Sequence, residues 1–169
     1  MRYFNGFSLY GEEVFFQEWL IESDFCVAGF SYGAQQALEY ALNSHQRIDR
    51  LILLSPAFFQ NQKKSFIRTQ LRYYKADPIS YQREFLKNVA YPSEIRLDRY
   101  LKQGDYESLN RLLSYVWDAK KIKSLIDRGV TIEVFIGEED RIVDAEASFE
   151  FFSSLSTTYK LKGVGHLLQ

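Results

Sequence analysis

The sequence has 169 residues, of which 46% are hydrophobic and 25% charged, and its formal net charge is −1. This length fits one domain that buries about 70% of its unfolded surface, and the balanced charge gives no support for nucleic-acid or membrane binding. A single cysteine, Cys26, excludes an internal disulfide and fits a reducing compartment. No apolar run approaches the ~18 residues of a membrane span and no secretory signal opens the sequence, so we expect a cytoplasmic protein.

Short apolar segments alternate with segments of helical periodicity along most of the chain. Strands are predicted at residues 2–4, 25–28, 50–54, 131–136 and 157–161. Helices are predicted at residues 12–22, 34–42, 119–128 and 145–155. Because this alternation is typical of a parallel sheet with helices on both faces, we predict an α/β fold with about five mostly parallel strands.

The pattern changes between residues 57 and 118, which are polar, basic and aromatic and contain no convincing strand. We predict three or four helices there, with breaks at Pro78 and Pro92. The segment is interpreted as a helical cap inserted before the last two strands. Residues 1–56 and 119–169 then form the core of the single domain.

A Gly-x-Ser-x-Gly motif at residues 29–33 stands between a predicted strand and a predicted helix. This layout is typical of a nucleophile elbow, in which a serine is held in a strained turn at the tip of a strand with its hydroxyl presented for attack. Glycines two residues before and after the serine allow the helix to pass close to the strand. The motif predicts that Ser31 is a catalytic nucleophile.

A serine nucleophile needs a histidine base and an acid that orients the histidine. Of the two histidines, His45 lies in a polar segment predicted to be an exposed loop, whereas His166 follows the last predicted strand in a glycine-rich loop. Asp140 follows the strand before it and is the preferred acid. Three further carboxylates compete with it, namely Glu138, Glu139 and Asp144, the last of which is better placed as a helix N-cap.

The remaining component is an oxyanion hole, built from backbone N–H groups that hold the developing negative charge. The N–H of Tyr32, directly after the nucleophile, is the first expected donor. The second is expected from the loop after the first strand, with the N–H of Phe7 best placed; a plain turn is the alternative for this loop.

With serine, acid and histidine in this order, the chain resembles an α/β-hydrolase that lacks strands at one edge, a truncated α/β-hydrolase fold. The Asn-Gly-Phe sequence at residues 5–7, the aromatic and basic cap, the segment 133–137 and the closing residues 166–169 are similar to the short pimelyl-acyl-carrier-protein methyl ester esterases of biotin synthesis (BioV type). The resemblance implies a triad of Ser31, Asp140 and His166, and an acyl carrier protein bearing a pimelyl methyl ester as partner and substrate. We expect no cofactor and no metal.

Residues 60–88 carry seven basic and two acidic side chains, an excess that would attract an acidic carrier protein. The residues expected to bind it are Lys63, Lys64, Arg68, Arg72 and Lys75, of which the last four share one helical face. A solvated helix face with no partner is the alternative. Five aromatic residues would line an acyl channel or simply pack the cap, namely Phe66, Tyr73, Tyr74, Tyr81 and Phe85.

Two other functions fit the same residues. An acyl-carrier-protein or acyl-CoA thioesterase would use the same triad on a different bond, because both reactions pass through the same kind of oxyanion. A catalytically inactive hydrolase fold could instead serve only as a module that binds the carrier protein.

Overall fold

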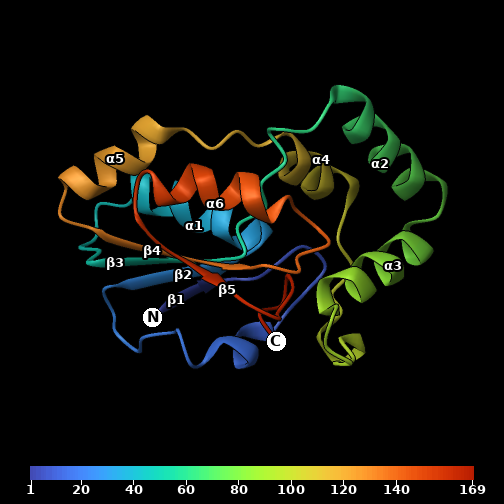
Figure 1. Cartoon of the computed structure of the whole chain (residues 1–169), viewed down its shortest axis with the longest axis horizontal. Helices are drawn as coiled ribbons and strands as arrows, with labels where there is room; N and C mark the ends of the chain where they lie inside the picture. Colours follow the sequence, from blue (N-terminus) through green and yellow to red (C-terminus); the bar gives the residue numbers. More distant parts are fainter.

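A parallel five-stranded sheet, with strands in the order β1-β2-β3-β4-β5, forms the centre of the computed structural model, which describes residues 1–169 (Figure 1). Every neighbouring pair of strands is parallel. The strands are β1 (Arg2–Phe4), β2 (Cys26–Phe30), β3 (Arg50–Leu54), β4 (Thr131–Gly137) and β5 (Thr157–Leu161). The predicted α/β fold with five strands is therefore confirmed.

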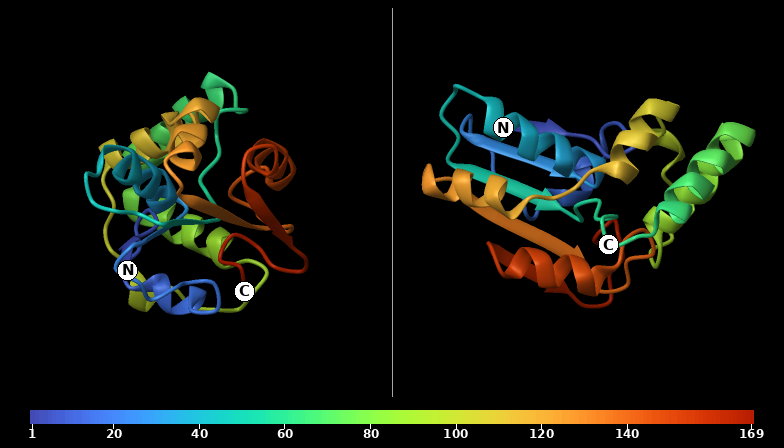
Figure 2. Two further views of the ribbon diagram at one scale, coloured as in Figure 1. Left: turned by 90° about the vertical axis from the view of Figure 1, so that its left-hand side faces the viewer. Right: turned by 90° about the horizontal axis from the view of Figure 1, so that it is seen from above.

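Three α-helices cover one face of this sheet, namely α1 (Tyr32–Asn43), α5 (Ala119–Asp127) and α6 (Ala145–Ser153) (Figures 1 and 2). We expected helices on both faces. The opposite face is covered instead by the short 3-10 helix η1 (Glu12–Phe16), one end of α3 (Pro78–Ala90) and residues 164–168. Leu51 and Leu53 of β3 point into the helical side, whereas Ile52 and Leu54 point into the other, because side chains alternate along a strand.

The segment between β3 and β4 contributes no strand to the sheet. It forms α2 (Lys64–Ala76), α3, the short η2 (Asp98–Tyr100) and α4 (Tyr106–Ser114), which lie beyond the carboxyl ends of the strands (Figure 1). Pro78 is the first residue of α3, where a missing N–H costs nothing, and Pro92 follows its end. No helix of the chain is both long enough and apolar enough to cross a lipid bilayer.

All but one of the predicted strands and core helices agree with the structure to within two residues at each end. The helix predicted at 12–22 is wrong: only η1 forms, followed by a turn in which the Trp19 N–H donates to the carbonyl of Phe16. Phe16 is buried there and Phe15, Trp19 and Leu20 are partly buried, but tertiary packing overrides local helix propensity. The strand predicted at 25–28 begins one residue later and runs on to Phe30, because Gly29 and Phe30 pair with β3.

Candidate active site

Ser31 lies alone between β2 and α1, with φ 55° and ψ −112°. A residue with a Cβ rarely adopts this backbone conformation, which costs of order 1–3 kcal/mol and is found mainly where a function depends on it. The two motif glycines make the turn possible: a Cβ on Gly29 would clash with the carbonyl of Gly33, and a Cβ on Gly33 with the carbonyl of Phe4. The turn therefore has the geometry of a nucleophile elbow.

His166 joins the serine to an acid. Its Nε2 lies 2.8 Å from Ser31 Oγ, and its Nδ1 lies 2.6 Å from Asp140 Oδ2. The other oxygen of Asp140 accepts hydrogen bonds from the N–H groups of Ile142 at 2.7 Å and Val143 at 3.0 Å, which fix the carboxylate. With Nδ1 donating to Asp140, Nε2 is the free base and accepts the proton of the Ser31 hydroxyl.

The loop that carries His166 is held tightly between β4 and the cap. A Cβ on Gly137, the last residue of β4, would clash with the carbonyl of Gly165, and a Cβ on Gly165 with the carbonyl of Tyr91. The Leu167 N–H donates to the carbonyl of Val89 in α3 at 3.1 Å. The histidine is thus positioned by both the sheet and the cap.

The competing candidates lie elsewhere. Glu138 and Glu139 are exposed and make no contact with His166. Asp144 accepts a hydrogen bond from the Ala147 N–H and caps α6, as predicted. His45 is exposed in the loop after α1. The structure therefore brings together the three residues preferred from the sequence and none of their alternatives.

The two expected oxyanion donors have N–H groups available. Tyr32 is the first residue of α1, so its N–H has no acceptor within the helix. The N–H of Phe7 donates no hydrogen bond within the chain. The loop after β1 lies against the elbow, because Gly33 packs on the carbonyls of Phe4 and Asn5.

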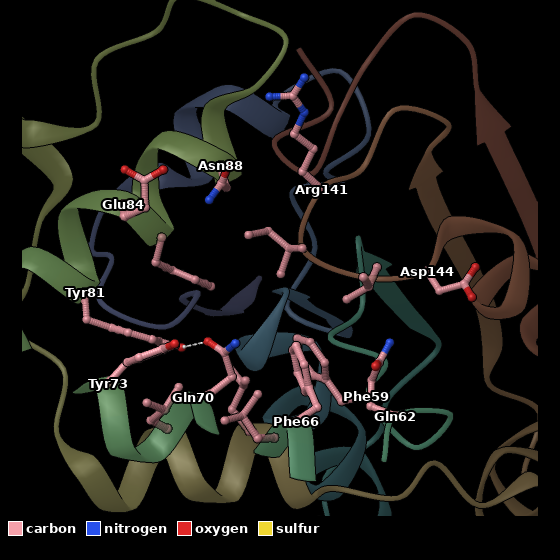
Figure 3. A pocket seen from close by; sticks show the side chains of 16 residues that line it. Phe59, Gln62, Phe66, Gln70, Tyr73, Tyr81, Glu84, Asn88, Arg141 and Asp144 are labelled. Atoms are coloured by element: carbon pink, nitrogen blue, oxygen red, sulfur yellow. Dashed lines mark hydrogen bonds between the residues drawn. The ribbon is translucent and has the colours of Figure 1, made fainter. Parts of the chain in front are cut away.

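A cavity of about 530 Å³ opens between the cap helices and residues 141–144, and its lining is mostly apolar (Figure 3). Four of the five aromatic residues expected at an acyl channel line it, namely Phe66, Tyr73, Tyr81 and Phe85. The Tyr81 hydroxyl donates to Gln70 Oε1 at 3.0 Å across the cavity wall (Figure 3). Tyr74 is instead buried, with its hydroxyl donating to the carbonyl of Gly104 and its ring packed edge-on against Phe7.

Neither Ser31 nor His166 lines this cavity. Ser31 is 2% exposed and His166 is fully buried. The cavity ends beside the site: residues 141–143 follow Asp140, and Phe85 of α3 packs edge-to-face on Phe7 with 5.6 Å between ring centres. The cavity and the Ser31 hydroxyl are therefore not in open contact in this structure.

The basic residues of the cap lie on the outside of α2. All five are exposed and none pairs with a carboxylate, namely Lys63, Lys64, Arg68, Arg72 and Lys75. The side chains that line the cavity come from the opposite side of the same helix, namely Phe66, Gln70 and Tyr73. The helix thus separates a basic surface from an apolar cavity.

Comparison with known proteins agrees with this architecture. A family model described as "Serine aminopeptidase, S33" matches residues 13–166. Bromoperoxidase from Bacillus anthracis superposes with a TM-score of 0.68 at 15% identity, with 85% of this chain and 60% of that chain covered. Naproxen esterase from Bacillus subtilis gives a TM-score of 0.60 at 18% identity, with 85% and 53% covered.

Carboxylesterase CesB, also from Bacillus subtilis, gives a TM-score of 0.51 at 21% identity, with 93% of this chain and 57% of that chain covered. At such identities the likeness shows the fold alone. The chain spans between 53% and 60% of the length of these three structures. A search of curated proteins finds no significant match in sequence.

Proposed function

The chain belongs to the serine aminopeptidase S33 family of α/β-hydrolases, and from this premise we propose that it is a serine carboxylic ester hydrolase. Its proposed reaction is removal of the methyl ester from a pimelyl group held on acyl carrier protein, a cytoplasmic step of biotin synthesis. The observation that carries the hydrolase proposal is the strained Ser31, hydrogen-bonded to a histidine that is itself hydrogen-bonded to Asp140.

In the proposed first step, Ser31 Oγ attacks the ester carbonyl while His166 Nε2 takes the hydroxyl proton. Asp140 stabilises the imidazolium that results and keeps the ring in its productive tautomer. The carbonyl oxygen becomes an oxyanion between the N–H groups of Tyr32 and Phe7, where each donor contributes about 2.7–4 kcal/mol to lowering the barrier.

The tetrahedral intermediate then breaks its bond to the methoxy oxygen. His166 gives that oxygen its proton, methanol leaves, and an acyl-enzyme on Ser31 remains. Water attacks the acyl-enzyme in turn, with His166 again taking a proton and returning it to Ser31 Oγ. The free acid is released and the enzyme regains its starting state.

The cavity supports an acyl substrate. Its aromatic and aliphatic walls suit an alkyl chain, and three lining residues, 141–143, directly follow Asp140, so one end of such a chain would lie toward the triad. Gln62 and Asn88 add polar groups to the lining. These features fit an extended chain that carries a reactive ester at one end.

The outer face of α2 supports an acidic partner. It combines exposed, unpaired cations on a helix without an acidic residue, and such a surface steers a negatively charged protein toward it. Because the same helix forms a wall of the cavity, a carrier docked on this face would lie one helix thickness from its own acyl chain.

The test is incubation of pimelyl-carrier methyl ester with the protein and with Ser31→Ala, followed by intact mass of the carrier. Loss of one methylene in mass, only with the unmodified protein, supports the esterase. A bare carrier would show a thioesterase instead. Unchanged carrier, together with no labelling of Ser31 by a fluorophosphonate, would show an inactive fold that at most binds the carrier.

A further inference from the structure

Glu12, the first residue of η1, is fully buried although it carries a carboxyl group. Its Oε1 accepts a hydrogen bond from the backbone N–H of Gly6 at 2.6 Å and another from the Tyr3 hydroxyl at 3.3 Å. Its Oε2 has no partner within the chain. The bond to Gly6 is the shorter of the two, and it reaches the loop that carries the second expected oxyanion donor.

The direction of the Phe7 N–H depends on the peptide group between Gly6 and Phe7. In a trans peptide the N–H points opposite to the carbonyl of the preceding residue. The carbonyl of Gly6 accepts from the Leu9 N–H at 3.2 Å, which turns the Phe7 N–H to the other side. Glu12 holds the N–H of the same glycine, so Gly6 is fixed at both its N–H and its carbonyl.

The rest of the loop is tied down independently of Glu12. The Gly11 N–H donates to Asn5 Oδ1 at 3.1 Å, and the Lys102 N–H donates to the carbonyl of Ser8 at 2.9 Å. What Glu12 adds is a contact directly at Gly6, one residue before the donor. A change at Glu12 therefore acts on the peptide that carries the Phe7 N–H before it acts on the loop as a whole.

A buried carboxyl group is an expensive way to accept one hydrogen bond. Burial raises the pKa of Glu12 to about 7, against the lowering effect of the Gly6 N–H, with neighbouring Glu13 and Tyr3 of β1 as the titratable groups that bear on it. Its ionised form makes a charge-assisted bond, which is shorter and about twice as strong as a neutral one. The triad does not use the Glu12 carboxyl group, so the free-energy cost of burying it suggests that the group has another role.

We propose that Glu12 is a positioning residue that holds the Gly6–Phe7 peptide so that the Phe7 N–H points into the oxyanion hole. This inference rests on the proposed hydrolase function. Glu12 acts through Gly6 and touches neither substrate nor Ser31. It contributes more in the transition state than in substrate binding, because the oxyanion exists only there.

Two substitutions separate positioning from folding. Glu12→Met removes the acceptor but fills a similar volume with an apolar chain suited to a buried site. Glu12→Gln keeps an oxygen that can accept from Gly6. Tyr3→Phe is the matched control, because it removes the other hydrogen bond of Glu12 and leaves the bond to Gly6 in place.

Steady-state hydrolysis of a short p-nitrophenyl ester is measured at pH 8 for all four proteins. For Glu12→Met we expect kcat to fall about 10- to 100-fold with KM within about two-fold, since complete loss of one oxyanion donor costs about 10²–10³. Glu12→Gln should recover most of this loss, and Tyr3→Phe should keep kcat within about two-fold. Thermal unfolding of Glu12→Met should be no lower than that of the unmodified protein.

A Glu12→Met variant with unchanged kcat, or a loss that Glu12→Gln does not recover, overturns the proposal. Backbone amide NMR tests the contact without an activity assay and without the Glu12→Met variant. The chemical shift of the Gly6 amide should change with pH as Glu12 titrates, and it should stay constant in Glu12→Gln. A Gly6 amide that ignores this titration also overturns it. If the unmodified protein hydrolyses no ester at all, the proposed function fails instead, so the two failures are distinguishable.

Discussion

Ser31 Oγ and His166 Nε2 lie 2.8 Å apart, although 135 residues separate them in the sequence. They meet because β2 and β5 end at the same edge of the parallel sheet, and because the histidine loop turns back across the end of β4. At that crossing Gly137 and Gly165 touch backbone to backbone. The contact between Ser31 and His166 therefore depends on the arrangement of several strands, and of the two residues Ser31 is the one with a strained backbone.

Replacing Ser31 tests both its chemistry and its strain. Ser31→Ala and Ser31→Gly both remove Oγ, so both should lose ester hydrolysis by about 10³-fold or more. They differ only at Cβ, which is disfavoured at φ 55° and ψ −112°. We expect Ser31→Gly to exceed Ser31→Ala in free energy of unfolding by about 1 kcal/mol, measured in urea. If Ser31→Gly is less stable than Ser31→Ala, the backbone at residue 31 is not strained.

Asp140→Asn should leave the fold intact and disable the base. An amide at this position favours the wrong tautomer of His166, and in a triad this lowers kcat by about 10⁴-fold. The control is Asp118→Asn, the same change at the N-cap of α5 and away from the cavity, where asparagine still caps the helix and kcat should stay within about two-fold. The measurement is kcat for ester hydrolysis. An equal loss of kcat in both variants would show that Asp140 is not the acid of the triad.

Much of the core could be predicted because its signals are local. The bounds predicted for β1, β3 and β5 are those observed, since each strand is a short extended run bounded by turn or loop residues. The elbow could be predicted because its glycines relieve contacts within a few residues of Ser31. The 3-10 helix after Gly11 could not be predicted, because the spacing of apolar residues indicates which side chains are buried but not which backbone hydrogen bonds form.

Some residues of the site could also be predicted from the sequence, and others could not. Ser31, Asp140 and His166 could be named because each follows its own strand, and parallel strands end at a common edge. Glu12 could not, because it stands at the start of what reads as an amphipathic helix, where a carboxylate is normally exposed. Its contact with Gly6 depends on a tertiary turn that has no sequence signature. The burial of Ser31 and the contact between Phe85 of α3 and Phe7 likewise depend on packing between segments that are distant in the sequence.

Charge reversal on α2 tests the proposed carrier surface. The double variant Arg68→Glu with Arg72→Glu should lower kcat/KM for a carrier-linked ester by about 10-fold at low salt, because steering by opposite charge is lost. Hydrolysis of a p-nitrophenyl ester should not change, since neither side chain lines the cavity. The difference should shrink as salt is added.

The matched control places the same change on α5, outside the cap, as Lys120→Glu with Lys123→Glu. Because net charge changes equally in both double variants, any difference between them reports the position of the charge. Equal loss in both would assign the effect to total charge and would leave α2 as a solvated helix face.

Glu12 should also make stability depend on pH. Burial raises its pKa from an ordinary 4.5 to about 7 in the folded protein, so the unfolded chain ionises first as pH rises. Folding is therefore unpenalised below about pH 4.5 and loses stability between there and about pH 7, by about 3 kcal/mol in all. Glu12→Gln cannot ionise and escapes this loss. The free energy of unfolding of Glu12→Gln, minus that of the unmodified protein, should thus grow by about 2–3 kcal/mol between pH 5 and pH 8 in urea titrations. A difference that stays constant across this range would mean that Glu12 titrates normally in the folded protein.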